Sequence, residues 1–179
     1  MGDLLLFYDY RDISGEDAPE VEGYESVRVV AWSMGVWAAS VLLSRWNIPV
    51  SCRVAINGTE RPVDEHYGIY LLTERGMTEQ GRDKFFARMF SGKEEMERFK
   101  ENRPCRAIDE QRDELRLIRE QSAREMPEMH WERVYVSEGD VIFPVENQRN
   151  WWGNRVEIIT LPGGHYPFYV LDNWEKIWK

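Results

Sequence analysis

Residues Val29 to Ser40, VVAWSMGVWAAS, carry the strongest signal of the fold in this sequence. It sets the hydroxyl of Ser33 between a run of β-branched and aromatic residues and a run of small and apolar ones. The first run predicts a buried strand over Val27 to Trp32. The second predicts a helix over Met34 to Trp46 that is apolar on nearly every side and therefore buried. Ser33 then lies at a turn from strand to helix.

A serine at such a turn suits the role of a nucleophile. It stands clear of the sheet, while the backbone N–H of the next residue, Met34, faces the same space. The tight turn favours small residues two positions before and after the serine, and Ala31 and Gly35 occupy those positions. Serine is also a favoured helix N-cap, so the local pattern alone equally allows a capping role.

The rest of the chain alternates strand and helix signals, which is typical of a parallel sheet covered by helices. The last helix is predicted over 167–178, with Pro167 in its first turn. The charge-rich stretch 78–126 predicts a helical cap inserted into a single α/β domain that spans 1–179. The other strand candidates are Leu4 to Tyr10, Cys52 to Asn57, Glu132 to Ser137 and Arg155 to Leu161.

Composition narrows the class of protein. Of 179 residues, 42% are hydrophobic and 31% are charged, which suits one buried core under a charged surface. No apolar run reaches the length of about 18 residues that a membrane-spanning helix needs, and no signal-peptide pattern is present, so a cytoplasmic protein is predicted. The net charge of −9 argues against nucleic acid as the main partner. Cys52 and Cys105 fit no metal spacing and are predicted to be free thiols.

A serine nucleophile needs a base to take its proton and an acid to orient that base. His165 follows the last predicted strand, where the pair Gly163 and Gly164 allows a flexible turn. Asp140 follows the fourth predicted strand on a turn closed by Pro144.

The order Ser33, Asp140, His165 is the chain order of α/β-hydrolases. Each residue stands just beyond the carboxyl end of a predicted strand, where sites in open parallel sheets lie. Asp64, which comes after the third predicted strand, stays open as an alternative acid.

Taken together, the motifs resemble the BioG-type pimeloyl-[acyl-carrier protein] methyl ester esterases of biotin synthesis, an α/β-hydrolase family. The matching segments include AWSMG around Ser33, AINGT over 55–59 and GGHYPF around His165, and they run through nearly the whole chain. The resemblance implies Ser33 as nucleophile, His165 as general base and then acid, Asp140 as orienting acid, and the Met34 N–H as an oxyanion donor. It implies a methyl ester of a pimeloyl chain on acyl carrier protein as substrate, with no metal or organic cofactor.

In that family a strand and a Gly-Trp-Gly loop precede the segment with which this chain begins, and the loop is thought to contribute to the oxyanion hole. A sheet without that strand has an exposed edge, which predicts self-association there. Two alternatives stay open. One is a truncated or inactive hydrolase fold that binds a partner or an acyl group. The other is a general short-chain esterase or thioesterase.

The sequence also offers candidate residues for binding the acyl chain and the carrier protein. Trp32, Phe143 and Trp151 are predicted to line an apolar slot for the acyl chain, whereas Trp37 and at least one of Trp151 and Trp152 are expected in the core. An acidic carrier protein needs a basic landing surface, and 81–106 carries eight basic residues against five acidic ones. A solvated helix face with internal ion pairs explains this mixture equally well. The predicted docking residues are Arg82, Lys84, Arg88, Arg98 and Arg103.

Overall fold

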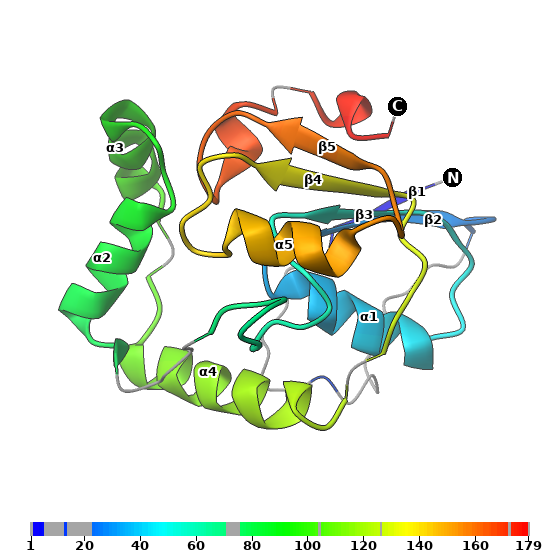
Figure 1. Cartoon of the computed structure of the whole chain (residues 1–179), viewed down its shortest axis with the longest axis horizontal. Helices are drawn as coiled ribbons and strands as arrows, with labels where there is room; N and C mark the ends of the chain where they lie inside the picture. The colour runs from blue at the N-terminus through cyan, green and yellow to red at the C-terminus, as the bar shows by residue number, and fades with distance from the viewer. Residues whose placement is uncertain are drawn as a thin grey trace.

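The computed structural model describes residues 2–5, 13, 23–70, 76–103, 105–125, 127–171 and 173–178. Its centre is a five-stranded sheet in which every neighbouring pair is parallel and the strands lie side by side in chain order (Figure 1). The predicted α/β class is therefore confirmed. The strands are β1 (Gly2–Leu5), β2 (Val27–Trp32), β3 (Val50–Ile56), β4 (Arg133–Ser137) and β5 (Ile158–Leu161).

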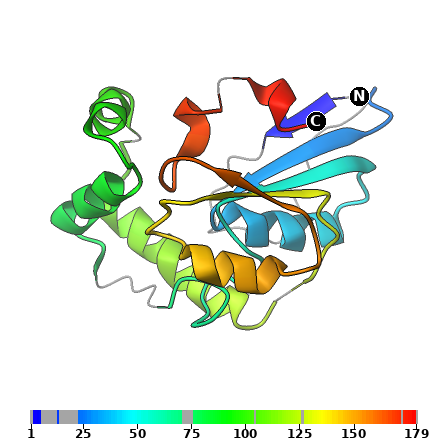
Figure 2. The ribbon, with the colours of Figure 1, turned by 45° about the horizontal axis from the view of Figure 1, so that its top comes forward.

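Both faces of the sheet are covered. Helices α1 (Gly35–Arg45) and α5 (Val145–Trp152) pack on one face, and the C-terminal segment lies across the other (Figure 2). Residues of β2 alternate between the two sides, since Val29 joins the core under α1 and Val30 joins the core under the C-terminal segment. Parallel strands buried on both faces are rich in apolar residues. Strand β2 is apolar at every position except Arg28, which explains why it has the predicted bounds.

Among the described residues between β3 and β4 there are three helices, all inside the stretch 78–126 that the sequence predicts as a cap. They are α2 (Glu79–Arg88), α3 (Lys93–Glu101) and α4 (Ile108–Ser122). Helices α2 and α3 lie beyond the carboxyl ends of the strands (Figure 1). The rings of Phe86 and Phe99 pack α2 against α3, with centroids 5.2 Å apart. These two helices therefore lie beyond the end of the sheet where a site is expected.

The C-terminal segment corrects one prediction. In place of one helix over 167–178, it forms two short 3-10 turns, η2 (Pro167–Tyr169) and η3 (Trp174–Lys176). Aromatic and β-branched residues have low helix propensity here. The Asn173 side chain accepts a hydrogen bond from the Glu175 N–H at 2.8 Å, so it starts a new turn instead of continuing the old one.

Helix α5 was not predicted from the sequence, although Pro144 precedes it and the parallel pair β4 and β5 requires a crossover. Two strands also begin at other residues than predicted. Strand β3 begins two residues before its predicted start, and β5 begins three residues after its predicted start. The predicted strand Leu4 to Tyr10 overlaps β1 at Leu4 and Leu5, and its remainder lies outside the described residues. Within the described ranges, no helix is long and apolar enough to cross a membrane.

Candidate active site

The turn at Ser33 has the sharp geometry that the sequence predicts. Ser33 has a φ of 57°, in the left-handed region that non-glycine residues seldom adopt. Its N–H donates to the Ile56 carbonyl at 2.9 Å and extends the β2–β3 ladder, while its carbonyl accepts from the Val36 N–H at 3.1 Å and begins α1. The backbone thus changes from strand to helix within one residue, which leaves the hydroxyl projecting beyond the sheet.

Gly58 allows β3 to approach this turn. A Cβ atom at position 58 would lie 2.1 Å from the carbonyl oxygen of Ser33. Only glycine fits against the backbone at that separation. The end of β3 and the Ser33 turn are therefore packed against each other through a residue that has no side chain.

His165 follows β5 on the predicted glycine turn. Gly163 has a φ of 94°, and a Cβ on Gly164 would come within 2.5 Å of the Met89 carbonyl at the end of α2. The side chain of His165 is completely buried, and its Nε2 lies 2.9 Å from Ser33 Oγ. The loop thus brings the imidazole within hydrogen-bond distance of the hydroxyl.

Asp140 completes the hydrogen-bonded chain. Its Oδ2 lies 2.9 Å from His165 Nδ1, and its Oδ1 accepts from the N–H groups of Ile142 and Phe143 at 2.9 Å each. The alternative acid Asp64 instead closes its own turn by accepting from the N–H groups of His66 and Tyr67. The structure therefore brings Asp140 to the imidazole and leaves Asp64 apart from it.

Two buried amides beside these residues were missed in the sequence. Gln148, on α5, donates from Nε2 to Asp140 Oδ2 at 3.1 Å and to the Phe143 carbonyl at 2.7 Å. Asn57 follows β3 directly and is fully buried, with its Nδ2 2.9 Å from the His165 carbonyl. The place of Asn57 after a strand was a usable signal, because Ser33 also follows a strand directly. Gln148 gave none, since its helix was not predicted.

The arrangement is suited to acyl transfer. A hydroxyl, an imidazole and a carboxylate in series can move a proton away from the attacking oxygen and stabilise the charge that forms on the ring. The N–H of Met34 has no backbone partner within the described part of the chain, and it follows Ser33 directly. It is therefore available for an oxyanion. Among the described residues, no group of three or more His, Cys, Asp or Glu side chains could hold a metal ion.

The family model described as "Pimeloyl-ACP methyl esterase BioG" matches residues 1–177. The chain belongs to the BioG family. The crystal structure of BioG from Haemophilus influenzae has a TM-score of 0.85 and 32% identity to it, over 96% of this chain and 81% of that one. A malonyl-[acyl-carrier protein] O-methyltransferase from Bacteroides fragilis is 37% identical over 175 residues, which cover 94% of this chain and 36% of that protein.

The wider likeness concerns the fold. The 2-hydroxy-6-oxo-6-phenylhexa-2,4-dienoate hydrolase of a Rhodococcus strain has a TM-score of 0.59 at 13% identity, over 87% of this chain and 62% of that one. Such neighbours show that the chain has the α/β-hydrolase fold. Its membership of the BioG family makes it a carboxylic ester hydrolase.

The residues predicted to line the acyl slot take different places in this member of the BioG family. The Trp32 ring lies 5.0 Å from the His165 ring and meets Tyr166 edge to face, so it borders the site. Burial raises the pKa of Tyr166 and keeps its phenol neutral. Phe143 is 0% exposed and presents no surface to a ligand. Trp151 belongs to the larger core cluster and packs against the rings of Tyr67 and Trp152. The predictions for Phe143 and Trp151 are therefore corrected.

Four of the five predicted docking cations of this BioG chain have contacts within the structure, and only Lys84 is exposed with none described. The contacts of these four cations are Arg82 with the Arg106 carbonyl, Arg88 with the Val141 carbonyl, Arg98 over the Tyr169 ring and Arg103 with Asp83.

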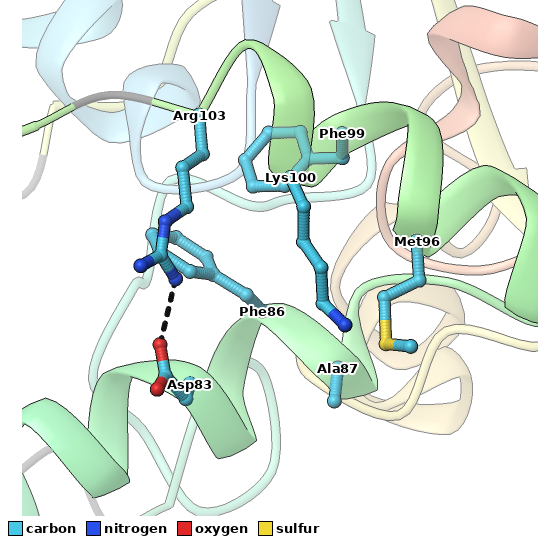
Figure 3. Close-up of a pocket in the computed structure, with 7 residues that line it drawn as sticks. All are labelled: Asp83, Phe86, Ala87, Met96, Phe99, Lys100 and Arg103. Carbon is cyan, nitrogen blue, oxygen red and sulfur yellow. Dashed lines mark hydrogen bonds and ion pairs between the residues drawn. The ribbon is translucent and has the colours of Figure 1, made fainter.

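A groove of about 540 Å³ lies between α2 and α3 (Figure 3). Phe86, Met96 and Phe99 are among its lining residues, and Lys100 and Arg103 border it.

Proposed function

We propose that this chain hydrolyses the methyl ester of a pimeloyl group carried on acyl carrier protein, with Ser33 as nucleophile. His165 acts as general base and then as general acid, and Asp140 orients the imidazole. The observation that carries the proposal is the unbroken series Ser33 Oγ, His165 Nε2, His165 Nδ1 and Asp140 Oδ2, with 2.9 Å at each hydrogen bond. The substrate comes from the family, whose model is described as a pimeloyl-ACP methyl esterase.

The reaction takes two steps. Ser33 Oγ attacks the ester carbonyl carbon while its proton passes to His165 Nε2, and the resulting oxyanion faces the Met34 N–H. The bond from the carbonyl carbon to the methoxy oxygen then breaks, and Nε2 returns the proton so that methanol leaves. A water molecule attacks the acyl-enzyme, its proton passes to Nε2, and Ser33 recovers that proton as the free carboxylic acid departs.

In this proposal the protein that binds to the esterase is the acyl carrier protein that carries the substrate. An acidic carrier is attracted by exposed cations near the site, and α2 carries Lys84 on its exposed surface. The α2 end contacts the catalytic loop directly, because the Met89 carbonyl accepts from the Tyr166 N–H at 3.0 Å. A carrier bound at α2 would thus lie close to His165.

Self-association at the sheet edge stays a prediction.

The test measures, by mass spectrometry, the release of methanol and the conversion of methyl pimeloyl-acyl carrier protein to pimeloyl-acyl carrier protein, which keeps the new carboxyl group on the carrier. The parent chain, Ser33→Ala and a matched control, Ser44→Ala, are compared. Ser44 lies exposed on α1, and its hydroxyl donates a hydrogen bond to the Val41 carbonyl. We expect the parent and Ser44→Ala to release methanol, and Ser33→Ala to lose activity by at least about a thousandfold.

The same assay with simple methyl esters separates the alternatives. Equal turnover of free and carrier-bound methyl esters would replace the proposal with a general short-chain esterase. Release of the carrier thiol in place of methanol would indicate a thioesterase. No product from any ester by the folded parent chain would leave only a binding role.

A further inference from the structure

Asn57 is a buried polar residue with no part in the proton transfer described above. It lies one residue beyond β3, is 0% exposed and has a φ of 47°. Asparagine tolerates this left-handed conformation better than most residues. Its own N–H donates to the Tyr135 carbonyl at 2.9 Å, so its backbone is fixed between β3 and β4.

The side chain of Asn57 joins two strand ends. Its Oδ1 accepts from the Ser137 N–H at 2.7 Å, and its Nδ2 donates to Ser137 Oγ at 2.8 Å. Nδ2 also donates to the carbonyl of His165 at 2.9 Å, with Gly164 O at 3.4 Å. Since Ser137 ends β4 three residues before Asp140, one amide connects the segment that leads to the acid with the backbone of the base.

The carbonyl of His165 has a second donor. Trp32 Nε1 reaches the same oxygen at 2.8 Å, and Trp32 is the residue immediately before Ser33. We call the two donors, Asn57 Nδ2 and Trp32 Nε1, the carbonyl clamp. They come from the ends of β2 and β3, which the sheet holds rigidly. The loop that they hold contains two glycines, so its own sequence leaves the backbone free to move.

We propose that the carbonyl clamp positions His165 for the reaction, with Asn57 and Trp32 as positioning residues. This inference rests on the proposed function, because it assigns a role at the same site. The clamp fixes the backbone of His165, and the ring can then meet Ser33 Oγ and Asp140 Oδ2 together. A displacement of about 1 Å at a reacting group can cost about a hundredfold in rate.

The test uses two variants, each with a matched control. Asn57→Gly removes the amide and keeps the left-handed backbone, and its control Asn147→Gly removes an amide that donates to the carbonyls of Glu65 and Gly68. Trp32→Phe removes the Nε1 donor of the clamp and keeps a smaller aromatic ring beside His165. Its control Trp37→Phe removes an Nε1 donor from the Glu125 carbonyl.

Two readouts are measured on each folded protein. The first is the rate at which a small fluorophosphonate labels Ser33, followed across pH by intact mass. The second is the downfield NMR resonance of the proton between His165 Nδ1 and Asp140 Oδ2. We expect the labelling rate to fall about a hundredfold in Asn57→Gly and about tenfold in Trp32→Phe, with the resonance broadened or lost. Both controls should keep the parent rate and resonance.

The outcomes separate the inference from the proposed function. A parent chain that shows the resonance but takes no label would remove the catalytic proposal, and the resonance in the variants would still test the clamp. Parent-like labelling and resonance in folded Asn57→Gly or in folded Trp32→Phe would overturn the clamp. Should Asn57→Gly not fold, the comparison of Trp32→Phe with Trp37→Phe decides alone.

Discussion

Four hydrogen-bond donors converge on the buried side chain of Asp140. Two are backbone N–H groups on Oδ1, and the others are Gln148 Nε2 and His165 Nδ1 on Oδ2. A buried carboxylate without such partners costs several kcal/mol. Each donor therefore helps to hold the side chain of Asp140 at the place where the imidazole needs it.

Replacing Gln148 by leucine tests this at the scale of one residue. Gln148→Leu keeps the side-chain volume and removes both hydrogen bonds, one of them to a charged group. We expect a loss of about 1.5–3 kcal/mol in the free energy of unfolding by urea and about a tenfold lower rate of Ser33 labelling. The control is Gln80→Leu at the exposed start of α2, which should match the parent. Unchanged labelling in Gln148→Leu would contradict the role.

At the scale of elements, the site depends on how closely β3 approaches the start of α1. Gly58→Ala would place a methyl group 2.1 Å from the Ser33 carbonyl, against backbone that cannot rotate away. We expect about a hundredfold slower labelling of Ser33, because the turn must move. In the control Gly92→Ala, the new methyl group would meet nothing closer than 3.8 Å. Normal labelling in Gly58→Ala would show that the turn tolerates a shift.

Helix α2 is the element on which carrier binding is expected. Lys84→Glu reverses an exposed charge without breaking a described contact, whereas Arg88 holds the Val141 carbonyl. We expect a rise in KM for carrier-bound ester of about three- to fivefold, with kcat unchanged, because one exposed charge pair contributes about 1 kcal/mol or less. The difference should shrink at high salt. An identical reversal on α5, Arg149→Glu, should leave KM unchanged; an equal rise there would argue against docking on α2.

At the scale of the whole molecule, the cover formed by the C-terminal segment depends on a neutral phenol. Tyr135 donates to the carbonyls of Lys176 and Ile177 at 3.2 and 3.3 Å, and it lies in the core beneath that segment. Burial raises the pKa of Tyr135 above its ordinary value of 10.0, and it also raises the pKa of the Cys52 thiol above 9.0. In both cases the folded protein favours the protonated form.

Stability should therefore be lost at alkaline pH. Because the folded pKa values are raised, the contribution of both groups is fully present below their unfolded values and disappears as pH rises through the folded values. Urea unfolding of the parent, from neutral pH to above 10.0, should show a falling free energy of unfolding. In Tyr135→Phe with Cys52→Ala the fall should be smaller, and an equally steep fall there would assign it to other groups.

The parallel sheet, and the end of the sheet at which the site lies, could be predicted from the residue pattern. The bounds of β2 follow from a run that is apolar on both faces, and Ser33, Asp140 and His165 each come after a strand. Parallel strands end at one edge, so the three residues were expected together without knowledge of any contact. Cys52 and Cys105 are free thiols, as predicted.

The contacts that hold these residues in place could not be predicted and are known from the folded structure alone. Asn57 donates to the His165 carbonyl, 108 positions away in the chain. Gln148 donates to Asp140 from a helix that the sequence pattern did not predict. The choice of Asp140 over Asp64 likewise depends on where the His165 loop lies. The hydrophobic period of the local sequence indicates whether a segment forms a helix or a strand. The sequence around an amide side chain, however, looks the same whether that side chain faces water or a catalytic loop. Its partner is set by packing between distant segments, which exists only once the sheet has formed.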